Sequence, residues 1–215
     1  MQSIRQLICL ISGIIIYLST CQHARAQGFS NRMYAYSTRD GLPSNVVSKV
    51  LTDKDGFTWV LTTNGLARFD GNRFNSILQN TSNKLSIQSG AIKDIILDEA
   101  GILWVVQGNQ LSKHLNQGFD FESYHLPDSL ISNQIISCYV DSRKSQAIIG
   151  ATGDFLLLDL NTGKYRSTGW RQYVRNQIPL FKPLLQGNSI IPKSVDEYWL
   201  LATNGLFSYS TKTHL

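Results

Sequence analysis

The stretch YRSTGWRQYVRNQ, residues 165–177, alternates arginines with large aromatic rings. Aromatic faces and guanidinium groups together can hold a sugar or an acidic group. The stretch also lies off the register of the repeats described below, where an insertion would form a surface loop that can carry function. We therefore predict a ligand site that comprises Arg166, Trp170, Arg171, Tyr173 and Arg175. The alternative is an outer β-strand whose charged face is simply solvated.

No other grouping of side chains predicts catalysis or a cofactor. The only glutamates are Glu99, Glu122 and Glu197, and no pair of them recurs as a site. The histidines have no metal-like spacing. Asp53 and Asp55 resemble the start of a calcium loop, but the later ligands of such a loop are missing. We expect no catalytic residue, no metal and no cofactor in this chain.

Residues 1–26 are predicted to be a secretory signal peptide. Arg5 precedes the apolar run 7–18, and small residues continue as far as Ala26. Lipid attachment at Cys21 is the alternative. The run is too short to predict a membrane span. These features predict an exported, periplasmic chain.

Loss of this leader changes the charge and the cysteine content. The net charge falls from +5 to +3, because Arg5 and Arg25 leave and no acidic residue does. Cys138 becomes the only cysteine, so no internal disulfide is expected. The remaining basic residues form no cluster, and we therefore expect no contact with nucleic acid.

A compact unit recurs along the chain, most clearly as DKDGFTWVLTTNGLARFDG at 53–71. Similar units surround Trp104 and Trp199, with an asparagine five residues after each tryptophan. A fourth, weaker copy lacks the tryptophan and has Ile148 in its place. The residues that define the repeat are Gly56, Trp59, Asn64, Gly65, Gly101, Trp104, Asn109, Trp199, Asn204 and Gly205.

The centres of the four units are 45, 44 and 51 residues apart, which is typical of β-propeller blades. No long stretch has helical periodicity. The strands are apolar on both faces, as expected where each blade is covered by its neighbours, so the recurring tryptophans are interpreted as packing between blades rather than as sugar-binding residues. Asn64-Gly65 predicts a type I′ hairpin turn. Residues 33–36 predict one extra strand.

We therefore predict an all-β fold, an incomplete ring of about four four-stranded β-propeller blades within residues 27–215. The first blade should have strands near 46–52, 57–63, 66–70 and 73–78. The four blades are expected near 46–78, 91–124, 135–166 and 188–215. A ring that stops after four blades, the last one short, indicates the N-terminal part of a longer propeller.

Residues 36–74 resemble the opening of the two-component regulator propeller family. The resemblance is carried by DGLPSN, DKDGFTW and TNGLARFDG, and weaker copies extend it over 29–215. It implies the periplasmic sensor half of a hybrid histidine kinase that responds to a carbohydrate. It also implies an oligosaccharide ligand, further blades and kinase domains as partners, an inner-membrane anchor and a homodimer for the full-length protein.

Two other functions stay open at this point. The chain could be a secreted propeller that binds another protein without any sugar. It could also be a glycan-active hydrolase or lyase, although convergent carboxylates near the ring centre are not evident. Nothing of a kinase domain is recognisable, so we expect this chain not to be an enzyme by itself.

Overall fold

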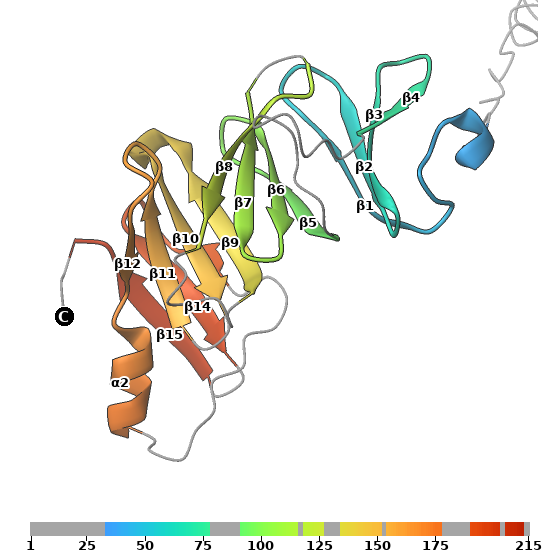
Figure 1. Ribbon diagram of the computed structural model, residues 1–215. Coiled ribbons are helices and arrows are strands. Elements are labelled where there is room, and N and C mark those ends of the chain that lie inside the picture. The colour runs from blue at the N-terminus through green and yellow to red at the C-terminus, as the bar shows by residue number, and fades with distance from the viewer. Residues whose placement is uncertain are drawn as a thin grey trace, which may run out of the picture. The chain divides into compact units, whose positions relative to one another are not determined.

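The structure is a computed structural model that describes residues 33–77, 91–115, 118–126, 134–151, 154–177, 190–202 and 205–212 (Figure 1). It separates into two compact units, Met1–Ala35 and Tyr36–Leu215, and every element below belongs to the second. The predicted signal peptide and Asn204 lie outside the described residues.

Four antiparallel sheets follow one another along the chain, and in each one neighbouring strands are consecutive in sequence (Figure 1). The first sheet contains β1 (Val47–Thr52), β2 (Thr58–Thr62), β3 (Gly65–Phe69) and β4 (Phe74–Ser76). The second contains β5 (Ile92–Leu97), β6 (Leu103–Gln107), β7 (Gln110–His114) and β8 (Phe121–His125). The third contains β9 (Ile135–Asp141), β10 (Gln146–Ala151), β11 (Asp154–Asp159) and β12 (Tyr165–Ser167). The fourth contains β13 (Ile190–Pro192), β14 (Glu197–Ala202) and β15 (Gly205–Ser210).

The predicted class, an all-β fold of consecutive propeller-type blades, is confirmed. Three sheets have four strands, and the fourth has three among the described residues. No closed ring forms within the described part of the chain.

The hydrophobic core lies between successive sheets. Trp59 is fully buried and packs with Leu61 and Leu66 against the second sheet. Trp104, at the same place in the second sheet, packs against the third. Ile148 takes this place in the third sheet and packs with residues of the fourth. The large ring at this position therefore fills the space between one blade and the next.

An aspartate in the turn before β2 and before β6 holds each of these tryptophans. Asp53 accepts hydrogen bonds from two backbone amides of its turn and, at 2.7 Å, from the Trp59 indole Nε1. Asp98 does the same for its own turn and for Trp104, at 3.0 Å. The polar edge of a buried indole is thus satisfied, as buried polar groups usually are. We call each such pair an Asp–Trp clamp.

Three local predictions were wrong. The turn at Asn64-Gly65 is not type I′, because that turn needs positive φ at both central residues and Ser145 is the only non-glycine residue with positive φ in the described part of the chain. The Thr62 hydroxyl supports this turn instead, accepting from the Asn64 amide and donating to the Gly65 carbonyl. Residues 33–36 form no strand, and Met33 and Tyr34 are exposed.

The third wrong prediction concerns helix. The chain forms α2 (Trp170–Gln177) where the sequence indicated a loop or an outer strand. The helix has only two turns, too few for a convincing periodic pattern. Trp170 and Val174, one turn apart, are its buried contacts.

Candidate functional site

The helix α2 connects the third sheet to the fourth and forms one wall of a pocket. Its first turn is fixed by Asp154, whose carboxylate accepts a hydrogen bond from the Arg171 backbone amide at 3.3 Å. Burial raises the pKa of Asp154, although the hydrogen bonds it accepts act in the opposite direction. A carboxylate at the start of a helix satisfies amides that have no partner within the helix.

The pocket, which we call the α2 pocket, has a volume of about 670 Å³. This is within the range of pockets that hold small ligands, roughly 300–1,000 Å³. The helix contributes Trp170, Gln172, Tyr173 and Asn176, and the opposite wall is formed by β14 and β15 with Leu200, Leu206, Phe207, Ser208 and Tyr209. Residues 168 and 169 complete the lining.

Aromatic rings dominate the pocket wall. Phe207 lies edge-on to Trp170 and to Tyr173, with ring centroids 5.7 and 6.4 Å apart. Trp170 is only 5% exposed, whereas Tyr173 is 49% exposed. Tyr173 is therefore the more accessible of these two rings, and both contact Phe207.

The Trp170 indole differs from those in the Asp–Trp clamps. Its Nε1 is buried and has no hydrogen-bond partner among the described residues. Such an unpaired donor is unusual in a folded protein. It marks this wall as a place where an added acceptor would stabilise the protein.

The polar groups of the pocket are uncharged. The Gln172 amide donates to the Asn176 carbonyl at 3.0 Å. Burial raises the pKa of Tyr209, while nearby Arg166 acts in the opposite direction. The phenol is thus neutral and can donate a hydrogen bond. Neither an acidic nor a basic side chain is part of the pocket lining as the described residues form it.

The five predicted site residues are only partly brought together. Trp170 and Tyr173 line the α2 pocket. Arg171 and Arg175 lie exposed on the helix and do not line it. Arg166 is on β12 and lines a separate hollow of about 390 Å³.

The sequence prediction missed the residues of the opposite wall. Phe207 and Tyr209 are more than thirty residues away along the chain and look like ordinary strand residues. One signal was available: Phe207 aligns with Ala67 of the first sheet, and a large ring replacing alanine indicates a local departure from the repeat.

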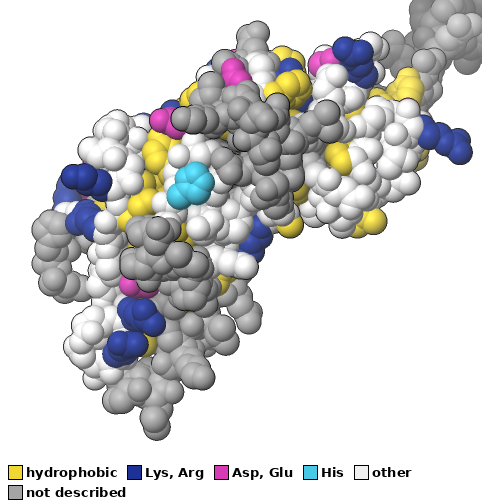
Figure 2. All heavy atoms as spheres, in the orientation of Figure 1, with side chains coloured by type: hydrophobic (Ala, Val, Ile, Leu, Met, Phe, Trp, Pro, Cys, Tyr) yellow, Lys and Arg dark blue, Asp and Glu magenta, His cyan; other side chains and the backbone are white. Residues whose placement is uncertain are grey.

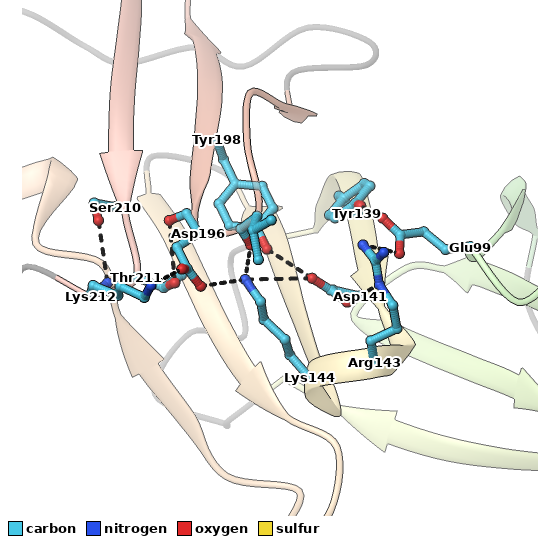
Figure 3. A network of polar contacts seen from close by, with 11 residues as sticks. Glu99, Tyr139, Asp141, Arg143, Lys144, Asp196, Tyr198, Ser210, Thr211 and Lys212 are labelled. Atoms are coloured by element: carbon cyan, nitrogen blue, oxygen red, sulfur yellow. Dashed lines mark hydrogen bonds and ion pairs between the residues drawn. The ribbon is translucent and has the colours of Figure 1, made fainter.

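A second polar site lies where the third and fourth sheets meet, at the opposite end of the third sheet from α2 (Figure 3). Asp141 aligns with Asp53 and Asp98, but the third sheet has no tryptophan for it to hold. The Tyr198 hydroxyl of the fourth sheet donates to Asp141 Oδ2 at 3.3 Å instead. Arg143 Nε lies 3.7 Å from Oδ1, and among the described residues Oδ1 has no hydrogen-bond partner.

Ion pairs extend this arrangement to both neighbouring sheets. Lys144 lies between Asp141 and Asp196, at 3.8 and 2.7 Å (Figure 3). Lys212 pairs with Asp196 at 2.5 Å, and Arg143 pairs with Glu99 of the second sheet. We call these residues, Glu99, Asp141, Arg143, Lys144, Asp196, Tyr198 and Lys212, the ionic joint.

Basic side chains elsewhere are dispersed. Figure 2 shows Lys and Arg in several separate places on the visible face, with hydrophobic groups between them. The described residues contain no group of three side chains that could bind a metal ion. No helix in the described part of the chain is long and apolar enough to span a membrane.

Consecutive four-stranded antiparallel sheets with a shared core define the chain as a β-propeller protein. A family model described as two component regulator propeller matches residues 41–64, the stretch that carries GLPSN, the clamp aspartate Asp53 and Trp59. The resemblance to that family is thereby confirmed.

Solved structures agree with this fold. The extracellular domain of BT4673 from B. thetaiotaomicron, described as a one component system in one structure and as a hybrid two component system in another, aligns with a TM-score of 0.65. The identity is 15%, and the alignment covers 87% of this chain and 24% of that one. The extracellular domain of the hybrid two component system BT3049 from the same organism aligns with a TM-score of 0.61 and 18% sequence identity. That alignment covers 84% of this chain and 25% of the BT3049 domain.

YCF48 from Cyanidioschyzon merolae is also similar, with a TM-score of 0.56 and 12% identity over 86% of this chain and 57% of its own. At such identities the likeness establishes the fold alone. The chain spans about a quarter of the two B. thetaiotaomicron domains. A search among curated proteins found no match.

Proposed function

We propose that this chain is part of the periplasmic sensor region of a two-component regulator of the hybrid histidine kinase type, and that it binds a carbohydrate in the α2 pocket. The observation that carries the proposal is the pocket itself, with its accessible ring, uncharged polar groups and suitable volume. The match to the regulator propeller family supports the sensor role. The two B. thetaiotaomicron neighbours are extracellular domains, which supports export.

The position of the pocket suggests how binding could be signalled. One wall belongs to the helix that follows the third sheet and the other to the fourth sheet. A ligand that touches both walls favours the arrangement of the two sheets in which both contacts are made. A ligand shifts such an equilibrium only by its difference in affinity for the two states. Further blades, kinase domains and a second copy of the full-length protein would convert that shift into a signal, and this segment itself would have no catalytic role.

A thermal-shift experiment tests carbohydrate binding directly. The full chain is heated with a panel of oligosaccharides, and a ligand at about 100 times its Kd should stabilise it by about 2.7 kcal/mol. Tyr173→Ala should abolish the shift, whereas Tyr34→Ala, an exposed tyrosine outside the pocket, should preserve it. Shifts of equal size in both variants would contradict the proposed location.

A second candidate function, protein interaction, is favoured by one surface. The fourth sheet presents Ile191, Trp199 and Leu206 on the face that each earlier sheet packs against the next, and Ile191 and Leu206 are 46% and 58% exposed. A further blade is the occupant we propose for this face. A partner captured by the chain without any sugar, and released by Ile191→Asp, which is outside the α2 pocket, would favour the interaction function.

A further inference from the structure

We infer that the α2 pocket selects an uncharged, hydroxyl-rich saccharide and discriminates against acidic sugars. This inference rests on the proposed function, since it assumes that the pocket binds a carbohydrate. It departs from the interpretation of the sequence, in which three arginines could have held an acidic group.

The first argument is the absence of a counter-charge in the pocket as described. The two helix arginines, Arg171 and Arg175, are exposed on the helix and do not line the pocket. A carboxylate that enters the pocket loses hydration and gains no cation in return, and burial of an unpaired charge is costly. A neutral ligand does not incur this cost.

The nearest cations outside the lining do not change this conclusion. Lys193 donates to Ser208 at 3.3 Å, but its ammonium is paired with Glu197 at 3.1 Å. Arg166 acts on Tyr209 from β12, where it lines the neighbouring hollow. Neither cation is part of the lining: Lys193 is balanced by Glu197, and Arg166 acts on Tyr209 from outside it.

The second argument is the pattern of donors and acceptors. Gln172 uses one amide hydrogen to reach the Asn176 carbonyl, which leaves the Gln172 oxygen as an acceptor and the Asn176 amide as a donor. A sugar hydroxyl both donates and accepts, so two hydroxyls on neighbouring carbons match this pair. A carboxylate only accepts, so it can use the Asn176 amide but not the Gln172 oxygen.

The third argument is the geometry of the rings. Tyr173 is half exposed and is braced by Phe207 at 6.4 Å, so its face is accessible and its orientation is supported. The apolar C–H face of a pyranose packs well against such a ring. Negative charge on the sugar contributes nothing to this contact, because the face of an aromatic ring itself carries a partial negative charge.

Isothermal titration of the full chain tests the inference. The probes are neutral oligosaccharides of glucose, xylose, mannose and galactose, and oligomers of galacturonate with the same number of residues. We expect at least one neutral series to bind and galacturonate to bind at least about tenfold more weakly. Tyr173→Ala and Asn176→Ala should each weaken neutral binding about tenfold. The matched surface controls Arg171→Gln and Arg175→Gln should change it by less than about twofold.

The melting temperatures of the variants must first show that they are folded. Each contrary outcome then identifies which part of the proposal is wrong. Tighter binding of galacturonate, weakened by Arg171→Gln or Arg175→Gln, would overturn the neutral selectivity while leaving carbohydrate binding intact. Neutral binding that Tyr173→Ala and Asn176→Ala leave unchanged would overturn the role of the α2 pocket. Failure of every probe to bind would contradict the proposed function, and this inference with it.

Discussion

The second and third sheets meet through an Asp–Trp clamp, whereas the third and fourth meet through the ionic joint. In the second sheet, Asp98 accepts from two turn amides and from the Trp104 indole. It also accepts a hydrogen bond from Ser142 of the third sheet. In the third sheet, Asp141 has the same place but accepts from Tyr198 of the next sheet.

This difference shows how one repeat position can serve two purposes. Where the tryptophan is present, the aspartate fixes its own sheet, and a buried ring fills the interface. Where Ile148 replaces the tryptophan, rings from other positions, among them Phe155, Trp170 and Tyr198, fill the interface, and charges on both sides of it supply the polar contacts. The α2 pocket is formed by the helix that follows the third sheet and by the fourth sheet, at the opposite end of the third sheet from the ionic joint. Contacts between partly exposed charges are weaker and easier to rearrange than a buried ring, which suits a site where ligand binding must alter an arrangement.

The largest effect is expected from Trp104→Ala. The ring is fully buried, and its removal should lower the free energy of unfolding by about 3–5 kcal/mol, as measured by urea denaturation. Trp199→Ala is the matched control, because Trp199 has the same register but is only partly buried. It should cost less than about 1.5 kcal/mol. Equal losses would contradict the assignment of the clamp to the interface.

The next largest effect is expected from replacing the aspartates, and Asp98 and Asp141 should differ in how much stability each one contributes. Asp98→Ala leaves two turn amides, an indole and a hydroxyl without their acceptor, and should cost about 3 kcal/mol. Asp141→Ala removes one hydrogen bond and two long ion-pair contacts, to Arg143 and Lys144, but it also removes a buried oxygen that has no hydrogen-bond partner in the described part of the chain, and it should cost about 1 kcal/mol. Urea denaturation of both variants measures the difference. A larger loss at Asp141 would show that the ionic joint is the stronger one.

A smaller effect is expected from Lys144→Met in the ionic joint. Its ion pairs should be worth about 1 kcal/mol at low ionic strength, and little at about 1 M NaCl, where screening is nearly complete. The loss caused by Trp104→Ala should be the same in both conditions, because burial of a ring depends little on screening. Unfolding of the two variants at low and high salt provides the comparison. A loss at Lys144 that is independent of salt would indicate packing rather than charge.

The smallest effect on stability is expected from Asp196→Asn, and it should disappear at acidic pH. Hydrogen bonds from Lys144 and Lys212 hold the pKa of Asp196 below its ordinary value of 3.8. A lowered pKa in the folded state stabilises the fold above the unfolded pKa, and this contribution is lost as the pH falls through the folded value. Asp196→Asn should therefore lower the unfolding midpoint at pH 6 and approach the native protein below about pH 3. A difference that persists at the lowest pH would contradict this origin.

The repeat could be predicted from the sequence because local spacing determines it. A tryptophan six residues after an aspartate, with a glycine between them, encodes both the turn and the clamp, as Asp53 and Trp59 illustrate. That spacing is complete in the first two blades, and the repeat positions Ile148 and Trp199 indicate the other two. Short turns then pair each strand with the next one along the chain, so each sheet forms from a continuous segment and needs no distant residues.

The site could be predicted only in part, because it depends on contacts between distant segments. Trp170 and Tyr173 were found by their residue type. The sequence could not show that a two-turn helix would direct Arg171 and Arg175 away from the pocket, or that Phe207 would lie opposite. The hydrogen bond from Tyr198 to Asp141 could not be predicted either, because these residues are on different sheets.

Hydrogen–deuterium exchange of the full chain, with and without the oligosaccharide that binds most tightly, tests most directly whether ligand is sensed at the joint between the third and fourth sheets. We expect slower exchange at 170–177 and 197–202, and no change around the Asp–Trp clamps at 53–62 and 98–107. Slower exchange confined to the first two sheets, with α2 and β14 unaffected, would contradict the account.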